Sequence, residues 1–309
     1  MIIKPFEKRD ADIAELTRLS KLPQVSAKTK ADIEKEIRFI RAGDTAEAET
    51  AYELDFMRGT SKNQMIIHGL RLEHEGRVAQ IDHLMITRLL DVYVLESKSF
   101  TGGLSVNEQG EFCTFYNNRP ISVPSPIAQN QKHIDVLKAV YASDAVAAPI
   151  RLGVRIPLNC KSVISVRKNA RITRPDGDIK GLYGLIKSDQ FPQFFEKDID
   201  DNTSVFQAAK IVSRETILEL AQSLAAQHKP IQFNWAGKFG ITEAAPKVAT
   251  PSKASTPAKP KAGPNVCAVC DEPLHWTVVK WCRRNSKKYE GILLCREHQK
   301  NVVLEGAKS

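Results

Sequence analysis

The chain has 309 residues, of which 42% are hydrophobic, and it carries a formal net charge of +9. This length predicts two domains, or one domain with an appendage, and the basic balance favours an acidic partner such as nucleic acid over a plain soluble protein with a basic tail. No run approaches ~18 uncharged apolar residues, so we predict no membrane span. Residues 1–16 carry charges where the apolar part of a signal peptide would lie, so we expect a cytoplasmic protein.

Helical patterns occupy the N-terminal part of the chain. Residues 6–41 are charged and show apolar residues at helical spacing, which predicts one or two surface helices. Asp44 or Thr45 is positioned to cap a further helix that runs to about Met57, and Gly59 is positioned to end it.

Strand patterns follow the helices. Residues 64–86 predict two strands joined by a turn at 74–77, and residues 89–100 predict a third strand that the sequence "TGG" interrupts. Residues 110–123 predict another hairpin. A helix is then expected at 125–143, entered through Pro126.

Later elements complete a mixed pattern of strands and helices. Residues 160–166 read as an apolar strand of the kind found inside a sheet, and residues 213–227 read as a helix with Ser213 as its cap. Because early antiparallel strands precede a buried strand, we expect an α/β or α+β fold with a mixed sheet.

The C-terminal part differs in composition. Residues 244–264 are rich in Pro, Ala, Ser, Thr and Lys, which predicts a flexible linker. Residues 247–309 hold twelve Lys or Arg and only five Asp or Glu, so most of the net charge lies here. We expect four regions: a helical extension (1–40), a main domain (41–235), a Pro/Ala/Lys-rich linker (236–264) and a small module (265–309).

Three charged residues lie within the apolar strand region. Glu96 and Lys98 are two residues apart, so in a strand they share one face. If the hairpin turns near Leu89, Asp82 lies opposite Glu96, or opposite Ser97 with a shift of one residue. The spacing therefore brings two carboxylates and one ammonium group together.

This set suits phosphodiester hydrolysis. Asp82 and Glu96, with the carbonyl of Ser97, offer oxygen ligands to Mg²⁺ or Mn²⁺, and such an ion polarises a phosphate and activates water. Lys98 would orient that water and offset developing negative charge. The alternative is that the two acids face solvent at strand ends and Lys98 is their salt-bridge partner.

The order of motifs around these residues resembles the nuclease-related domain (NERD) family of the PD-(D/E)xK nuclease superfamily. That family shows a helix with a glutamate, a strand with aspartate, a strand with E-[ST]-K, a glycine, and a helix that opens with P-x-x-Q. The matching positions are Glu47, Asp82, Glu96 with Lys98, Gly102 or Gly103, and Pro126 with Gln129.

The resemblance implies a restriction-endonuclease-like α/β fold, a mixed sheet flanked by helices. It implies that Asp82 and Glu96 bind the metal ion and that Lys98 is the catalytic lysine, with Glu47 and Gln129 approaching from the preceding and following helices. The family's usual Gly-Glu is Ala46-Glu47 here, which leaves Glu49 as a rival for the helical glutamate.

Four of the six cysteines lie in the C-terminal module. Two short pairs, C-x-x-C and C-x-x-H, match the spacing of a structural zinc site, and a module of this size needs a metal ion or a disulfide to fold alone. The predicted ligands are Cys267, Cys270, Cys295 and His298. Cys282 is either a core thiol or a substitute ligand, and the alternative to zinc is a small core of reduced thiols.

The module also resembles the topoisomerase-type zinc ribbons that follow nuclease domains, whose ordinary role is nucleic-acid binding. Its basic run lies beside aromatic residues that suit base stacking. The predicted nucleic-acid contacts are Arg283, Arg284, Lys287 and Lys288. Alternatives are a solvated charge run around a Trp core, or docking of another protein.

Together these observations predict a metal-dependent DNA nuclease with a nucleic-acid-binding zinc module. The alternative is a nuclease fold with little or no activity that binds nucleic acid or a DNA-processing partner. The sequence does not distinguish DNA from RNA, and it gives no oligomeric state.

Overall fold

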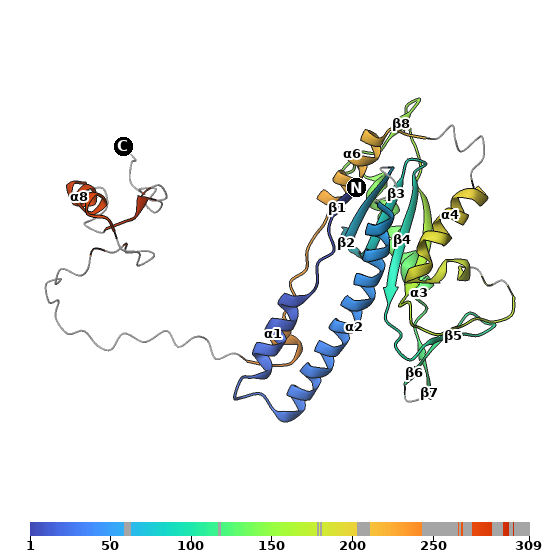
Figure 1. Ribbon diagram of the computed structural model, residues 1–309, viewed down its shortest axis with the longest axis horizontal. Coiled ribbons are helices and arrows are strands. Elements are labelled where there is room, and N and C mark those ends of the chain that lie inside the picture. The colour runs from blue at the N-terminus through green and yellow to red at the C-terminus, as the bar shows by residue number, and fades with distance from the viewer. Residues whose placement is uncertain are drawn as a thin grey trace. The chain divides into compact units, whose positions relative to one another are not determined.

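The computed structural model describes residues 1–58, 63–116, 119–177, 179, 181–202, 211–242, 265, 267, 274–285, 293–296 and 299. Two compact units divide the chain, Met1–Glu243 and Ala244–Ser309 (Figure 1). The first unit is built around one large sheet, and the second contains a single described helix, α8 (Trp276–Arg284).

The large sheet has six strands in the order β1-β2-β3-β4-β10-β12. The strands are β1 (Ile2–Lys4), β2 (Gln64–His74), β3 (Arg77–Thr87), β4 (Asp91–Lys98), β10 (Asn159–Val166) and β12 (Leu185–Lys187). β2, β3 and β4 form an antiparallel meander, whereas β10 runs parallel to both β4 and β12. The expected mixed sheet is confirmed, with the strand at 160–166 in its interior.

Helices cover both faces of this sheet (Figure 1). The helices are α1 (Asp10–Ser20), α2 (Ala27–Arg58), α3 (Pro126–Ala142), α4 (Phe191–Asn202), α6 (Arg214–Ala226) and α7 (Trp235–Lys238), with short 3₁₀ turns at Leu182–Gly184 and Ser188–Gln190. Alternate strand residues point to opposite faces. Ile67 therefore packs in the cluster that includes α3 and α6, while Ile66 packs in the cluster that includes α2 and α4.

A smaller sheet follows the end of β4. Its four strands are β11 (Ile172–Thr173), β5 (Leu104–Val106), β6 (Phe112–Tyr116) and β7 (Arg119–Val123), in that order, and a separate hairpin pairs β8 (Ile150–Arg151) with β9 (Val154–Arg155). Gly102 permits the close approach of this sheet, because a Cβ there would lie 1.9 Å from the carbonyl oxygen of Phe115. The expected interruption at "TGG" is thus a sharp transition between two sheets.

Most expected elements are confirmed. The turn at 74–77 joins β2 to β3, and the hairpin expected at 110–123 is β6 with β7. The predicted Ser213 cap forms, since Ser213 Oγ accepts a hydrogen bond from the amide of Thr216 at 3.1 Å. The helix that opens at Pro126 is capped by Ser125, whose Oγ accepts a hydrogen bond from the amide of Ala128 at 3.2 Å.

The predicted helix start at Asp44 or Thr45 is wrong. α2 continues without a break from Ala27 to Arg58, and Gly43 lies inside it. Asp44 is buried and accepts a hydrogen bond from the backbone amide of Arg9 at 3.2 Å, so it joins the N-terminal segment to the helix instead of capping one. Gly59, the expected stop, lies outside the described residues.

The N-terminal helices and α7 share a core of their own. Leu16 and Leu19 of α1, Ile33 and Ile40 of α2, and Trp235 of α7 are all buried in one cluster. α2 therefore spans two cores, packing its first half on α1 and its second half on the sheet. Within the described residues, no helix is both long enough and apolar enough to cross a membrane.

Candidate active site

Asp82, Glu96 and Lys98 come together at the end of β4. Because β3 pairs with β4 through His83 opposite Leu95, continuing the register by one residue puts Asp82 opposite Glu96. The amide of Ser97 donates a hydrogen bond to Asp82 Oδ2 at 2.7 Å, and Lys98 Nζ lies 2.7 Å from Glu96 Oε1. The structure thus places these three charged groups on neighbouring strands, as the spacing requires.

Helix α3 adds two side chains to this group. Gln129 donates from Nε2 to Glu96 Oε1 at 2.8 Å and accepts at Oε1 from Lys98 Nζ at 3.0 Å, so it joins both. His133 lies one turn later, with Nδ1 3.3 Å from Glu96 Oε2. The sequence reasoning missed His133, although the spacing of four residues from Gln129 puts both on one helix face.

Helix α2 carries the two rival glutamates, Glu47 and Glu49. Burial raises the pKa of Glu47 to about 7, aided by the negative charges of Asp44 and Glu96, so this carboxyl interacts electrostatically with the site. Glu49 is used elsewhere, because it accepts a hydrogen bond from Arg167 Nη2 at 2.8 Å and one from the amide of Lys168 at 3.2 Å. Glu47 therefore interacts electrostatically with Glu96, whereas Glu49 pairs with Arg167.

The pKa shifts show that negative charge is crowded here. Burial, followed by the charges of Glu96 and Glu47, raises the pKa of Asp82 well above its usual range. Burial also opposes ionisation of Glu96, but the adjacent His133 and Lys98 side chains outweigh it and lower the pKa of that carboxyl. Glu96 is therefore the carboxyl that ionises most readily, whereas burial and neighbouring negative charge favour the protonated forms of Asp82 and Glu47.

A series of polar side-chain contacts holds the hydroxyl of Ser97. The Ser97 hydroxyl lies 3.2 Å from Thr50 Oγ1 and 3.2 Å from His83 Nε2, and His83 Nδ1 lies 2.7 Å from His68 Nδ1. Burial lowers the pKa of both histidines, so both are neutral near pH 7. His68 Nε2 also lies 3.4 Å from Asp55 Oδ1, so the contacts connect Ser97 through His83 and His68 to Asp55.

The carboxylate group fits a divalent cation by its chemistry. Asp82 and Glu96 present hard oxygen donors, and the raised pKa values of Asp82 and Glu47 reflect burial together with mutual repulsion, which a bound cation would relieve. Among the described residues, no group of three or more His, Cys, Asp or Glu side chains is arranged as a ready metal site. An ion would therefore rely on backbone oxygen and water for its remaining ligands.

Comparison with known families selects the same part of the chain. Residues 42–164 match the nuclease-related domain (NERD) family. The matched segment contains the second half of α2, the β2–β3–β4 meander, α3 and most of β10, and hence every residue of the site. No curated protein and no solved structure matches the chain.

The match identifies residues 42–164 as a nuclease-related domain, which implies a nucleic-acid substrate and is compatible with a divalent metal ion as cofactor. It confirms the sequence resemblance for residues 42–164. Residues 1–41 and 165–309 lie outside the match, so it lends no support to the zinc-ribbon resemblance of the C-terminal module.

The second unit is described only in part. The amide of Cys295 lies 3.3 Å from Cys267 Sγ, which brings these two predicted zinc ligands together, whereas Cys270 and His298 lie outside the described residues. Cys282 is buried, with Sγ 3.4 Å from the carbonyl oxygen of Leu294 and 3.2 Å from Nε2 of Gln299. Helix α8 occupies part of the stretch between the two predicted ligand pairs.

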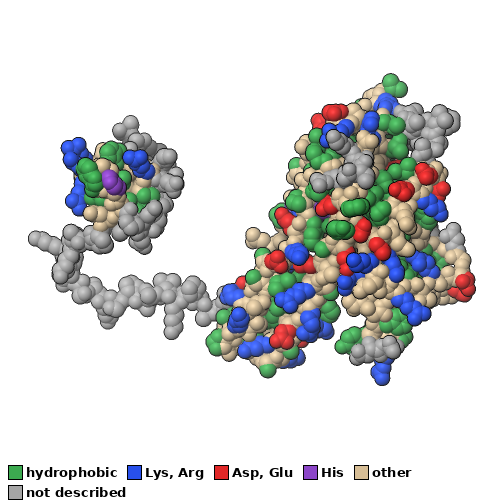
Figure 2. All heavy atoms as spheres, in the orientation of Figure 1, with side chains coloured by type: hydrophobic (Ala, Val, Ile, Leu, Met, Phe, Trp, Pro, Cys, Tyr) green, Lys and Arg blue, Asp and Glu red, His purple; other side chains and the backbone are tan. Residues whose placement is uncertain are grey.

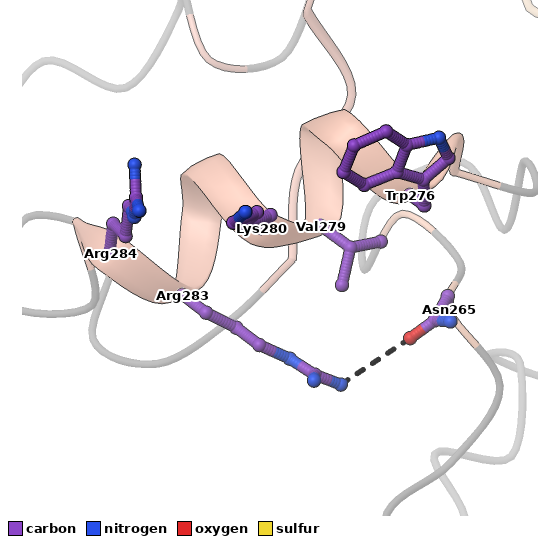
Figure 3. A pocket seen from close by; sticks show the side chains of 6 residues that line it. All are labelled: Asn265, Trp276, Val279, Lys280, Arg283 and Arg284. Carbon is purple, nitrogen blue, oxygen red and sulfur yellow. Dashed lines mark hydrogen bonds between the residues drawn. The ribbon is translucent and has the colours of Figure 1, made fainter.

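One face of α8 carries aromatic and basic side chains (Figure 3). Trp276, Lys280, Arg283 and Arg284 are all exposed, and Lys280 Nζ lies 5.8 Å from the centre of the Trp276 ring. Arg283 is steadied by Asn265, whose Oδ1 accepts a hydrogen bond from Nη2 at 3.4 Å. Of the predicted nucleic-acid contacts, Arg283 and Arg284 are thus exposed on a helix, and Lys287 and Lys288 lie outside the described residues.

Proposed function

We propose that this protein is a Mg²⁺- or Mn²⁺-dependent nuclease that hydrolyses phosphodiester bonds in DNA at the site around Glu96. The proposal rests chiefly on one observation. Glu96 is buried at the end of β4, yet it is contacted at once by Lys98, Gln129 and His133. A buried, ionised carboxylate with this set of partners is costly to build, and such arrangements are concentrated at functional sites.

Each residue has a role that follows from its position. Asp82, Glu96 and the carbonyl of Ser97 would hold the ion, which when bound polarises the scissile phosphate and activates a water molecule. Lys98 would orient that water and offset the negative charge that develops on the phosphate. Gln129 holds Lys98 and Glu96 in register, and Glu47, with a pKa of about 7, is suited to exchange a proton near neutral pH.

A cleavage assay on several substrates tests this proposal. Wild-type protein is incubated with plasmid, linear duplex and single-stranded DNA, and with RNA, in Mg²⁺, Mn²⁺ or EDTA. Lys98→Ala is the test variant, and Lys132→Ala, which removes an exposed lysine on the outer side of α3, is the matched control. We expect cleavage by the wild type and the control in metal, and at least a 100-fold loss in Lys98→Ala and in EDTA.

The second candidate is a nuclease-like protein that binds nucleic acid or a DNA-processing partner without cutting. One observation favours it, namely that Lys98 is engaged in an ion pair with Glu96 at 2.7 Å, as in a structural salt bridge. Tight binding of DNA with no cleavage in either metal would support this candidate over the first.

We also propose that Cys267, Cys270, Cys295 and His298 bind one structural zinc ion, and that the module binds nucleic acid through Arg283, Arg284, Lys287 and Lys288. The approach of Cys295 to Cys267 and the exposed basic face of α8 support this. Metal analysis of the purified chain should find about one zinc per molecule, lost in Cys267→Ser/Cys270→Ser and kept in Cys113→Ser/Cys160→Ser. No zinc in the wild type would refute the zinc site.

A further inference from the structure

A row of cations begins where the parallel strands of the sheet end. In the register of β10, Val166 is paired with Lys98 of β4 on one side and with Lys187 of β12 on the other. The chain then continues as Arg167-Lys168-Asn169-Ala170-Arg171, with three cations and no acid in five residues. Because neighbouring strands lie about 4.8 Å apart, this segment starts one strand spacing from the Lys98 position.

The 167–171 segment is held firmly in place. The amide of Ala170 donates to the carbonyl of Arg167 at 2.9 Å, which closes a turn, and the carbonyl of Arg171 accepts from the amide of Leu104 at 2.7 Å. Glu49 of α2 anchors the other end through the side chain of Arg167. The segment is therefore fixed between the helix that carries Glu47 and the loop that follows Lys98.

Two cations of this segment remain available to a ligand. Lys168 and Arg171 are exposed, and in the part of the chain that the structure describes neither has an acidic partner within 4.0 Å. Arg167 is different, because its guanidinium is occupied by Glu49. Burial and the charge of Asp189 raise the pKa of Glu53, and the charge of Lys168 opposes this shift only in part.

The placement also suits an extended ligand. Gly103 lies against Arg171, since a Cβ there would be 3.1 Å from the Arg171 carbonyl oxygen, so Arg171 is joined directly to the loop that leaves the active-site strand. Figure 2 shows a group of Lys and Arg side chains on the molecular surface where β4 ends. Cations spaced along a surface beside a hydrolytic site match a polymer of phosphates better than a single small anion.

We propose that Lys168 and Arg171 bind the sugar-phosphate backbone of the nucleic-acid strand next to the phosphate held at Glu96 and Lys98. This inference rests on the proposed nuclease function and names the surface that guides its substrate. Both residues lie beyond residue 164, outside the matched NERD segment. Contacts to phosphate fix the register of a strand and carry no base preference, so the surface accepts any sequence.

Salt dependence of binding tests the proposal without requiring cleavage. The full chain is titrated in EDTA against fluorescent duplex and single-stranded DNA of mixed sequence, over a range of KCl concentrations. Lys168→Ala/Arg171→Ala is compared with Lys28→Ala/Arg38→Ala, which removes the same charge from exposed positions in the first half of α2. Circular dichroism and thermal melting confirm folding, and Lys168→Gln/Arg171→Gln provides a second variant that retains long side chains.

Each phosphate contact contributes about 0.9 to the slope of log K against log salt for duplex DNA. We therefore expect the test variants to reduce that slope by about 1.8 and to weaken binding at least tenfold at low salt, with the control unchanged. A slope equal to that of the wild type, or an equal loss in the control, would overturn the proposal.

The two proposals fail in different ways. If the protein does not cleave in any metal but the test variants show a smaller slope of log K against log salt, the proposed nuclease function fails. The binding surface then belongs to a protein that binds nucleic acid without cutting it. If the protein cleaves and the test variants keep the wild-type salt slope and affinity, the nuclease proposal stands and Lys168 and Arg171 do not contact its substrate.

Discussion

The carboxylate of Glu47 should make the folded protein less stable as the pH rises. Its pKa is raised from 4.5 to about 7, first by burial and then by the charges of Asp44 and Glu96. The folded chain therefore keeps a proton that the unfolded chain releases between these two values, so stability is present below pH 4.5 and falls until the pH passes 7. At 1.36 kcal/mol per pKa unit, the complete effect is about 3 kcal/mol.

Glu47→Gln removes the charge and keeps the shape of the side chain. Because Glu47 retains some contact with solvent, we expect the variant to be more stable than the wild type by about 2–3 kcal/mol at pH 8, and to lie within about 0.5 kcal/mol of it at pH 4.5. The variant should also lose activity, since stabilising an active site by removing its charge commonly costs function.

Urea unfolding, followed by circular dichroism in EDTA at pH 4.5 and pH 8, measures this difference. Glu34→Gln on the exposed side of the same helix is the control and should change stability by less than about 0.5 kcal/mol at both pH values. The reasoning is refuted if Glu47→Gln is destabilised at pH 8, or if its difference from the wild type is the same at both pH values.

Other substitutions test how the site is supported. Gly102→Ala would place a Cβ 1.9 Å from the Phe115 carbonyl oxygen, so the melting temperature should fall by roughly 5–10 °C. Gly43→Ala lies inside α2 with no close contact and should raise stability by about 1 kcal/mol. Equal shifts of the two melting temperatures would contradict this. Asn130→Ala removes hydrogen bonds to the carbonyl oxygen of Val94 in β4 at 2.8 Å and to the hydroxyl of Ser162 in β10 at 2.9 Å. The free energy of unfolding in urea should fall by about 2–3 kcal/mol, and a fall below about 0.5 kcal/mol would show that these bonds contribute little. Ser213→Ala removes the cap of α6 and should cost about 1 kcal/mol by the same measurement, with no effect on cleavage.

The sequence was most informative where polar residues interrupt apolar strands. Asp82, Glu96 and Lys98 were placed together by strand periodicity alone, since residues two apart share a face and a hairpin sets the partner strand. Strand pairing then explains why the amide of Ser97 reaches Asp82. Local spacing was sufficient because all of these contacts arise within one antiparallel meander.

Contacts between distant segments were not predictable in the same way. Gly43 and Asp44 resemble a helix boundary, but the burial of Asp44 against Arg9 and the packing of α1 and α7 keep α2 continuous. His133 is a lone histidine in the sequence, and only the docking of α3 on β4 brings it to Glu96. Short elements such as β12 depend on pairing with β10 and carry little signal of their own.

The dependence of DNA cleavage on divalent metal ions tests the central claim most directly. The initial rate on the best substrate is measured as Mg²⁺ is increased from zero, for the wild type and for Asp82→Asn. We predict no cleavage in EDTA, a rate that rises and saturates with Mg²⁺ in the wild type, and no such rise in Asp82→Asn at concentrations that saturate the wild type. Cleavage that persists in EDTA, or that is equal in Asp82→Asn and the wild type, would contradict a metal-dependent nuclease site at Asp82 and Glu96.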